Sequence, residues 1–458
     1  MPIGQITNKT LFQKHQPQQR SLEFRNWRLF GICDLVIWDF RLTGGRALRV
    51  HHPFCPLTPD KETAFMHKVV SLANSMEAGL VQFLRDVVSL PLGSGNEGPV
   101  IGRLRREMEA IGYEEVKTDG LGNLFGRLGD GPRIVVIDGH CDVVDIGNPE
   151  NWEVDPTAGE IKDGLLFGRG ACDQKGGLTS AIYAGRILKE IGIPEDITLW
   201  VVASIMEEDC EGLCWKYIIE EDKLKPDVVL VTEPTNLGIY RGHRGRLEMK
   251  VHVDGVSSHG SAPERGVNAI YKMAPIIADI EQLNARLRDD PFLGKGTVTI
   301  TDIRSTSPSL CAVADSCTIH LDRRLTAGET IESALNEITT LPSFQAANAK
   351  AWVPEYRIPS YTGVEYGMQS YFPTWVLEED NPILQTAVSS YRSLFGGQPV
   401  VDKWTFSTNG VGIMGMYGIP TFGFGPGNEI YAHAPNECIP VEHLTRASAF
   451  YAQFVLAF

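Results

Sequence analysis

The sequence has 458 residues and a formal net charge of −15, with 43% hydrophobic and 22% charged residues. Such an acidic chain lacks the excess of Lys and Arg that marks a nucleic-acid-binding surface, and no run approaches the roughly 18 apolar residues of a membrane span. The length predicts two or three domains of about 150 residues each. Nine cysteines without a CxxC pair are typical of free thiols in a reducing cytoplasm, which is the predicted location.

Residues 1–65 differ from the rest of the chain. They are basic and Gln-rich at the start, contain no acidic residue before Glu23, and show neither helical nor strand periodicity. Two interpretations remain open: a transit peptide, or an extension upstream of the first domain, with Met66 or Met76 as the native start. We assign this segment no function.

The next part of the chain alternates predicted helices and buried strands. Apolar residues recur at helical spacing over 76–87 and 100–111. Continuous apolar runs that end in polar residues then predict buried parallel strands at 133–140, 197–208 and 227–233. Between the first two strands, a helix over 176–191 ends before Gly192 and Pro194. Strand, helix and strand in this order predict an α/β domain with a mostly parallel sheet and helices on both faces.

The pattern changes near residue 242. Segments 247–253 and 297–303 alternate polar with apolar residues, which predicts strands with one solvated face. A helix over 268–287 and a strand at 317–321 complete an α+β pattern. The α/β features return after about residue 365, with a buried strand at 420–424. We therefore predict a catalytic domain formed by 66–241 and 366–458, with a domain inserted at 242–365.

Carboxylates and imidazoles follow the predicted strands of the α/β domain, at the edge where such sheets bind ligands. They are His140 and Asp142, then Asp173 before the helix, Glu207 and Glu208, Glu233, and His433. Each has an ordinary alternative: a structural His, an N-cap Asp, or glutamates on a solvated face. Two carboxylates that close an apolar strand, however, cost desolvation free energy unless cations compensate. Together these strand ends favour a divalent-metal site.

The motifs at these positions resemble those of the M20 metallopeptidases from about residue 76 to the end. The shared elements are the HxD pair at His140, the GRGxxDxKG loop at 168–176, the double glutamate, Glu233 and the AHxxxE ending at 432–437. This family includes acetylornithine deacetylase, succinyl-diaminopimelate desuccinylase, aminoacylase and glutamate carboxypeptidase. The CDQKGG, STNGV and AHAPNE segments are most similar to a subgroup of selenium-metabolism-linked hydrolases.

The resemblance implies a role for each site residue. Asp173 would bridge two divalent ions, Zn²⁺ or else Co²⁺ or Mn²⁺. The two remaining ligand pairs would be His140 with Glu233 and Glu208 with His433. Asp142 would fix the tautomer of His140, and Glu207 would be the general base. Adjacent residues on a strand point opposite ways, so Glu208 can bind metal while its neighbour Glu207 faces the substrate.

The inserted domain resembles the family's dimerisation and lid domain, which implies a homodimer. His259 matches a histidine that reaches the partner subunit's site to stabilise an oxyanion, and Arg324 one that grips a substrate carboxylate. A turn histidine and a surface salt bridge are the alternatives. Residues 309–314 lack the usual Asn-x-Val-Pro element, and Asn409 stands in a segment that replaces Gly-Thr-Asp. Asn409, Gly425 and Gly427 complete the candidate substrate contacts.

The predicted reaction is hydrolysis of a linear amide, in an N-acyl amino acid or a dipeptide with a free carboxylate, by a water that bridges two metals. One alternative is cleavage of a ureido or carbamoyl group on the same scaffold. Another is a relative that binds metal or ligand without turnover. Glu207, the metal ligands and His259 are all present, which favours an enzyme.

Overall fold

A computed structural model of the chain describes residues 59–458, with side chains from residue 67. Most of the segment 1–65 therefore lies outside the described residues. Its last residues belong to helix α1 (Pro59–Ser75), which continues past the boundary predicted at residue 65. Within the described part, no helix combines the length and apolarity needed to cross a membrane, and all seven cysteines there are free thiols.

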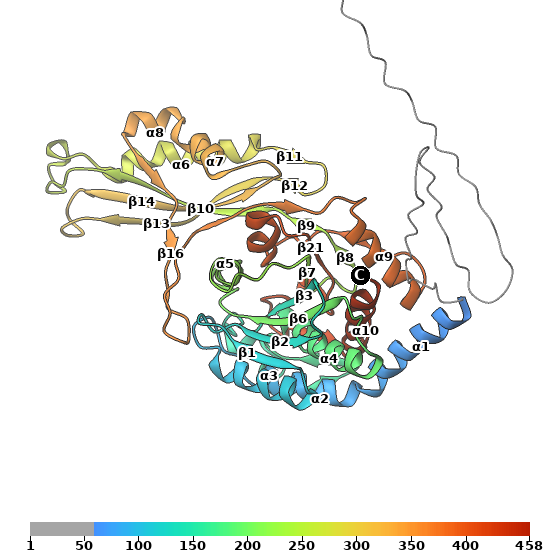
Figure 1. Ribbon diagram of the computed structural model, residues 1–458. Helices are drawn as coiled ribbons and strands as arrows, with labels where there is room; N and C mark the ends of the chain where they lie inside the picture. The colour runs from blue at the N-terminus through green and yellow to red at the C-terminus, as the bar shows by residue number, and fades with distance from the viewer. Residues whose placement is uncertain (1–58) are drawn as a thin grey trace, which may run out of the picture. The chain divides into compact units, whose positions relative to one another are not determined.

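The larger sheet has eight strands and a parallel centre (Figure 1). Its order is β1 (Glu115–Thr118), β2 (Leu124–Leu128), β6 (Ile197–Ser204), β3 (Arg133–His140), β7 (Val228–Val231), β21 (Thr421–Gly423), β8 (Ile239–Tyr240) and β20 (Val401–Asp402). The four central strands β6, β3, β7 and β21 are mutually parallel. Every residue of β6 and β7 is buried, as expected for strands covered on both faces.

Helices cover both faces of this sheet, which confirms the predicted α/β class. Helix α4 (Gly176–Ile191) packs so closely on one face that a Cβ on Gly139 of β3 would lie 3.0 Å from Leu178. On the other face, the carboxylate of Asp138 contacts Trp215 of α5 (Leu213–Glu220). The remaining helices of the domain are α2 (Glu77–Val88), α3 (Gly98–Ile111), α9 (Pro382–Phe395) and α10 (Val441–Ala457).

After about residue 242 the chain leaves the first domain and forms a second sheet with its own apolar core. Its strands are β13 (Thr297–Thr306), β14 (Ser316–Leu325), β10 (Gly245–Asp254) and β15 (Lys350–Trp352), with β18 (Tyr371–Phe372) paired to β10. Along β10, buried and half-exposed residues alternate, as predicted. Helices α6 (Ala269–Arg286), α7 (Ile331–Thr339) and α8 (Pro342–Ala347) lie on the apolar face (Figure 1). We call residues 242–365 the lid; these limits remain a prediction.

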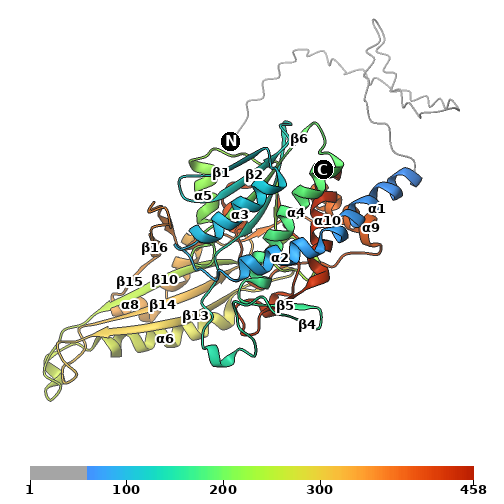
Figure 2. The same cartoon turned by 90° about the horizontal axis from the view of Figure 1, so that it is seen from below.

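A hairpin of β16 (Glu355–Tyr356) and β17 (Met368–Gln369) leaves the second sheet and reaches the first domain beside β1 (Figure 2). The hydroxyl of Tyr361 at its tip donates to the carbonyl of Gly122 at 2.8 Å, and Thr362 donates to that of Gly120 at 2.9 Å. The chain returns through β19 (Trp375–Val376), which pairs with β9 (Gly242–His243). The two sheets are therefore joined by this contact as well as by the crossing strands.

One strand prediction was wrong at its end. Strand β6 finishes at Ser204 and not at Glu208, so Glu207 and Glu208 lie in the turn that follows. Met206 has φ +59, in the left-handed region, which an extended strand cannot contain. The prediction that the two glutamates point to opposite sides of a strand is therefore wrong, and this turn sets their directions.

Candidate metal centre

All the predicted metal ligands meet at the carboxyl ends of the parallel strands. His140 is the last residue of β3, and Glu233 follows β7 by two residues. Asp173 lies in the turn Ala171–Lys175 that leads into α4. His433 comes from the loop between η5 (Glu429–Tyr431) and β22 (Cys438–Pro440). The topology thus gathers residues that lie up to 293 positions apart between 140 and 433.

The carboxylate of Asp173 lies between two imidazoles. Its Oδ1 is 3.1 Å from Nε2 of His140, and its Oδ2 is 3.4 Å from Nε2 of His433. On the His140 side, Oε1 of Glu233 is 3.5 Å and Oε2 of Glu207 is 3.7 Å from the same nitrogen. On the His433 side, Oε2 of Glu208 is 2.8 Å from Nε2. The five predicted ligands and Glu207 therefore form one cluster.

Burial and mutual repulsion govern the charges in this cluster. Burial raises the pKa of Glu208 to about 7, and it raises the pKa values of Glu207 and Glu233 well above the usual range, with repulsion between the carboxylates adding to the effect. Burial alone would lower the pKa of His140, but the surrounding carboxylates outweigh it and raise that pKa. Asp173 is also buried, yet its contact with His140 lowers its pKa. The cluster therefore favours added positive charge.

The donor atoms fit a divalent cation. Oε1 of Glu207, Oε1 of Glu208 and Oε2 of Glu233 are buried and have no hydrogen-bond partner, an arrangement that costs free energy unless a cation is bound. Two sets of ligand atoms each lie within 4.8 Å of one another: His140 with Glu207 and Glu233, and His140 with Asp173 and Glu208. Imidazole and carboxylate are ordinary ligands of zinc and of neighbouring divalent metals.

Glu437, which received no predicted role, organises the loop that carries Asp173. This fully buried carboxylate accepts hydrogen bonds from Nη1 of Arg169 and from the backbone N–H groups of Gly170, Cys172 and Asp173, at 2.7 to 3.0 Å. The spacing of four residues in the AHxxxE motif was the signal for it. Asp173 itself is not an N-cap, because α4 has Lys175 at that position and its carboxylate faces the imidazoles.

Asp142 approaches Nδ1 of His140 more closely with its backbone carbonyl than with its carboxylate. Nδ1 of His140 lies 2.9 Å from the backbone carbonyl of Asp142, against 3.6 Å from its carboxylate. The carbonyl can only accept, so Nδ1 carries a proton, which leaves Nε2 as the ring nitrogen that can bind a cation. The carboxylate of Asp142 instead accepts from the hydroxyl of Ser94 and from the backbone N–H groups of Glu207 and Glu208. It therefore fixes the turn after β6.

Asn409 does not occupy a substrate-contacting position. Its side chain has no exposed surface. Nδ2 donates to Asp138 and Ser204, both at 3.0 Å, while Oδ1 accepts from the N–H of Gly212 at 2.9 Å and lies 3.2 Å from Sγ of Cys214. Its hydrogen-bonding capacity is used within the protein. The prediction of a substrate contact is therefore corrected to a structural role that ties its loop to the sheet.

The two candidate glycines support the backbone near Glu233 and Asp173. A Cβ on Gly425 would lie 2.1 Å from the carbonyl oxygen of Glu233, and one on Gly427, whose φ is +81, would lie 2.6 Å from Sγ of Cys172. Only glycine allows this close approach. A role of either residue in substrate binding remains a prediction.

His259 and Arg324 lie in the lid. His259 is exposed, and its Nδ1 accepts from the backbone N–H of Ser261 at 3.1 Å, which leaves the proton of a neutral ring on Nε2. Arg324 forms a two-pronged ion pair with Asp322 on its own strand, with Nε–Oδ1 at 2.8 Å and Nη2–Oδ2 at 3.0 Å. Neither residue belongs to the cluster around Asp173.

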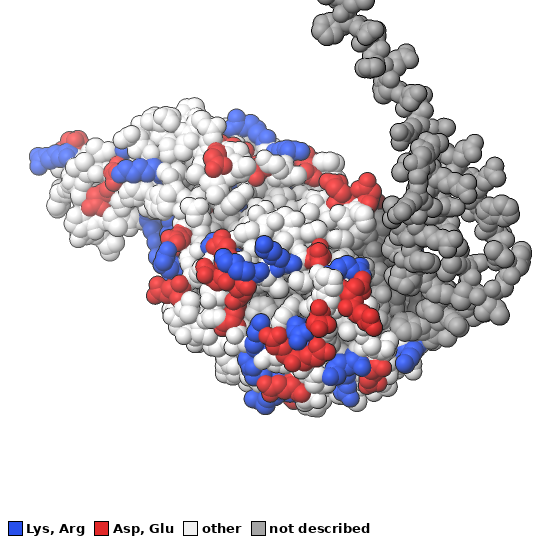
Figure 3. Space-filling model, in the orientation of Figure 1, with Lys and Arg blue, Asp and Glu red and all other residues white. Residues whose placement is uncertain are grey.

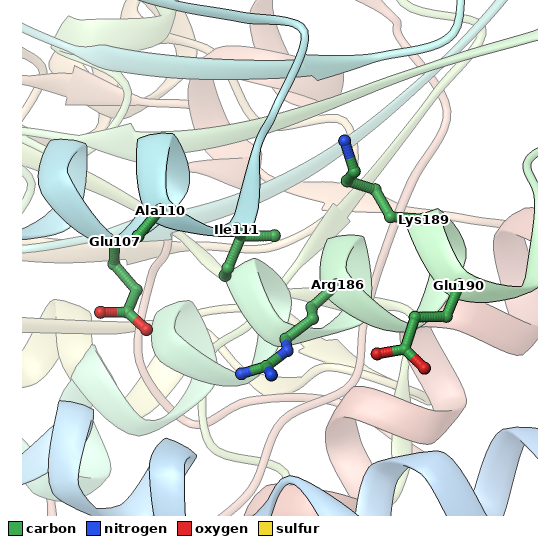
Figure 4. A pocket seen from close by; sticks show the side chains of 6 residues that line it. All are labelled: Glu107, Ala110, Ile111, Arg186, Lys189 and Glu190. Atoms are coloured by element: carbon green, nitrogen blue, oxygen red, sulfur yellow. The ribbon is translucent and has the colours of Figure 1, made fainter.

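Within residues 59–458, both groups of candidate metal ligands belong to this cluster. A shallow pocket of about 340 Å³ lies between α3 and α4 (Figure 4); it is lined by Glu107, Ala110, Ile111, Arg186, Lys189 and Glu190 and includes no residue of the cluster. On the face shown in Figure 3, acidic and basic side chains are interspersed without a continuous basic area.

Comparisons with known proteins agree on the family. The profile of the peptidase family M20/M25/M40 matches residues 136–457. The Escherichia coli (strain K12) "Uncharacterized protein YgeY" is 51% identical over 389 residues, which cover 85% of this chain and 96% of that protein. The "Probable succinyl-diaminopimelate desuccinylase" of Staphylococcus aureus (strain MRSA252) is 32% identical over 216 residues, 45% of this chain and 52% of that protein.

Two crystal structures share the fold. A tripeptidase from Staphylococcus aureus superposes with a TM-score of 0.65 at 21% identity, covering 83% of this chain and 98% of that one. The YXEP protein of Bacillus subtilis, described as a dinuclear metal-binding peptidase of family M20, superposes with a TM-score of 0.60 at 15% identity, covering 84% and 98%. The motifs, the cluster at the sheet edge and the matched profile together place this chain in the peptidase family M20/M25/M40.

Proposed function

We propose that this chain hydrolyses the amide bond of an N-acyl amino acid or a dipeptide that carries a free carboxylate. Membership of the family makes it a hydrolase of amide bonds; the substrate class is our proposal. The observation that carries the proposal is the buried set of three unpartnered carboxylate oxygens beside two imidazoles. Such a set is suited to hold divalent cations and suits little else.

Asp173 is the residue best placed to contact two cations, because its two oxygens face different imidazoles. We assign His140 and Glu233 to one ion, and Glu208 and His433 to the other. Zn²⁺ suits these ligands, and Co²⁺ or Mn²⁺ would also bind. When bound, two such ions would polarise the amide carbonyl and make hydroxide available near neutral pH.

Glu207 is the general base in this proposal. Its carboxylate lies in the cluster and its Oε1 has no protein partner, which leaves that oxygen free to accept a proton. It takes a proton from the water that attacks the carbonyl carbon. It then delivers that proton to the nitrogen as the C–N bond breaks, which leaves a free acid and an amine.

The lid supplies the remaining contacts. In Arg324, Nε and Nη2 are held by Asp322, which orients the guanidinium and leaves Nη1 for a substrate carboxylate. His259 has Nε2–H available as a donor to an oxyanion. Because His259 lies outside the cluster of its own chain, we propose that it acts on the site of a second copy.

A homodimer through the lid follows from this. Strand β13 pairs with β14 on one side only within the described sheet, so its other edge is open. Apolar side chains are exposed on this strand and on the neighbouring helix, with Ile303 at 52% and Tyr271 at 77%. A second copy that pairs along this edge would cover both. The resemblance to selenium-metabolism-linked hydrolases remains a prediction that no relative above bears on.

A substrate screen tests the function. Zn²⁺- and Co²⁺-loaded protein is assayed against N-acetyl, N-succinyl and N-carbamoyl amino acids and against dipeptides. We expect cleavage of an N-acyl amino acid or a dipeptide. Cleavage of the carbamoyl compounds alone would favour the ureido alternative. Binding of two metal equivalents with no cleavage of any amide would favour a non-catalytic relative.

The Glu207→Gln variant tests the mechanism. We expect it to bind two equivalents of Zn²⁺ and to lose about 10²- to 10⁴-fold in kcat, the usual contribution of a general base. Asp209→Asn is the matched control, because Asp209 is exposed two residues away and bonds only Tyr356 of the lid. It should stay within about 2-fold of wild type, as expected for a surface position. Unchanged turnover in Glu207→Gln would remove this residue as the base.

A further inference from the structure

The backbone N–H groups of the turn between β6 and the paired glutamates all donate to side chains, and the carbonyl of Met206 accepts from the N–H of Cys210 at 3.1 Å. After Ser204 the backbone leaves the sheet, and four successive N–H groups donate to side-chain oxygens. Ile205 donates to Oδ1 of Asn123 at 3.1 Å, Met206 to Oε1 of Glu97 at 3.0 Å, and Glu207 and Glu208 to the carboxylate of Asp142 at 3.3 and 3.1 Å. No strand or helix ladder sets the conformation of this turn.

Met206 is the pivot of the turn. It is fully buried, and its φ of +59 is a conformation that a side chain with Cβ disfavours. Extended backbone would send Glu207 and Glu208 to opposite sides, whereas in this turn both carboxylates lie in the one cluster. A strained residue persists only where its surroundings hold it. The contact that holds Met206 therefore decides where both carboxylates lie.

Glu97 holds the N–H of Met206 through its Oε1. It directly precedes α3, it has no exposed surface, and its Oε2 has no hydrogen-bond partner. Chiefly through burial, its pKa is raised to about 7. A buried carboxyl with an unpartnered oxygen is unfavourable for stability on its own. The N–H of Met206, the residue before Glu207, donates to Oε1 of Glu97 at 3.0 Å, and the backbone N–H groups of Gly95 and Glu97 lower the pKa of the same carboxyl.

The backbone around Glu97 is itself fixed. Its carbonyl accepts from the N–H of Ile101 in the first turn of α3. A Cβ on the next residue, Gly98, would lie 3.1 Å from the ring of Tyr361, the residue at the tip of the hairpin from the second sheet. The position of Glu97 is therefore fixed by its surroundings. It reaches Met206 from the start of α3, a helix that contains none of the candidate metal ligands.

We propose that Glu97 is a positioning residue for Glu207 and Glu208, acting by holding the N–H of Met206 in the left-handed turn. This rests on the proposed function, in which Glu208 binds metal and Glu207 moves the proton. Asn123 does the same for Ile205 from the other side of the turn. Glu97 touches neither substrate nor metal, so its loss should alter both affinity for metal and turnover while leaving the binding of substrate nearly unchanged.

The test compares two neutral variants of equal length. Glu97→Gln keeps an oxygen acceptor at the same reach, and Glu97→Met removes it. Zn²⁺ binding is measured by calorimetry, exchange of the backbone N–H groups of 205–208 by mass spectrometry, and kcat and KM with the best substrate of the screen. We expect Glu97→Gln within about 2-fold of wild type, and Glu97→Met to lose about 10- to 100-fold in Zn²⁺ affinity and in kcat, as is usual for groups that orient ligands. KM should change little, and exchange at 205–208 should rise.

Leu104→Ala controls for a general loss of stability, because Leu104 is buried in α3, about two helical turns after Glu97. It should lower the Tm and keep Zn²⁺ affinity. If Glu97→Met does not fold, Glu97→Asp replaces it, because the shorter side chain cannot reach Met206. The proposal is overturned if the variant without the acceptor binds Zn²⁺ as Glu97→Gln does, or if Leu104→Ala loses as much affinity. Failure of wild type to bind Zn²⁺ would instead refute the metal site itself.

Discussion

Replacing Glu437 with Ala should destabilise the protein and loosen the loop that carries Asp173. The carboxylate accepts four hydrogen bonds, one from Arg169 and three from backbone N–H groups of residues 170–173, in a fully buried position. Its removal leaves the Arg169 guanidinium, whose side chain is only 3% exposed, without its counter-charge. The N–H of Asp173 loses its partner as well.

The magnitude follows from the buried ion pair. Removing one partner of such a pair costs about 3–5 kcal/mol, because the other charge stays buried. The four bonds are not additive, so we expect a loss in this range and not a multiple of it. An unfolding entropy of about 2.1 cal/mol/K per residue over the unit Thr63–Phe458 converts the loss to a fall in Tm of roughly 4–6 °C.

The assay is thermal unfolding of metal-free protein followed by Zn²⁺ titration. Glu437→Gln keeps the volume and one acceptor, so it should fall between wild type and Glu437→Ala. Glu442→Gln, at an exposed position five residues on, is the control and should shift the Tm by less than about 1 °C. We also expect weaker Zn²⁺ binding in Glu437→Ala. A Tm within 1 °C of wild type would refute the reasoning that this carboxylate holds the loop.

Three further predictions concern pH, metal and assembly. Burial lowers the pKa of His243 to about 3 in the native state. Below about pH 6.5 this histidine is therefore protonated in the unfolded chain and neutral in the native state. Stability should fall as pH drops from 6.5, and the Tm difference between wild type and His243→Gln should shrink between pH 7.5 and 5, whereas a constant difference would contradict the assignment. Chelation should lower the Tm by about 3 °C relative to protein with Zn²⁺ at 100 times its Kd, and added Zn²⁺ should restore it. An unchanged Tm would argue that the native protein does not bind Zn²⁺ at this site. Ile303→Arg on the open edge of β13 should give monomers in analytical ultracentrifugation if wild type is a dimer through this edge, with Arg304→Ala as the control, and a dimer retained by Ile303→Arg would place the interface elsewhere.

Features set by short-range pattern could be predicted from the sequence. Strand β3 and helix α4 have the bounds that the apolar run and the glycine after Ile191 indicate. The alternation along β10 appears as one buried and one half-exposed face. The cluster around Asp173 could also be predicted, because polar residues at the ends of parallel strands must meet at one edge of the sheet. Each of these follows from local periodicity or from topology.

Features set by distant side chains could not be predicted. The end of β6 depends on Glu97 and Asn123, which lie 109 and 82 residues before the N–H groups that they hold. Nothing in the apolar run before Glu207 signals a left-handed Met206. In the same way, Asn409 lies beside a family motif, but its side-chain N–H groups donate to Asp138 and Ser204 on neighbouring strands. A motif locates a residue near a site; tertiary hydrogen bonds decide whether it faces the substrate.

The protein's own basic side chains near the cluster do not neutralise its carboxylates. Arg169 and Lys175 belong to the same loop as Asp173, and both are directed away from the cluster. Arg169 pairs with Glu437. Lys175, fully buried and with its pKa lowered to about 8 by burial, donates to the carbonyls of Val87 and Leu90 at the end of α2. No Lys or Arg of the described residues forms an ion pair with the buried carboxylates of the cluster, which face only His140 and His433. Two imidazoles cannot balance four ionised carboxylates, and the raised pKa values of Glu207, Glu208 and Glu233 reflect that imbalance, which divalent ions would relieve.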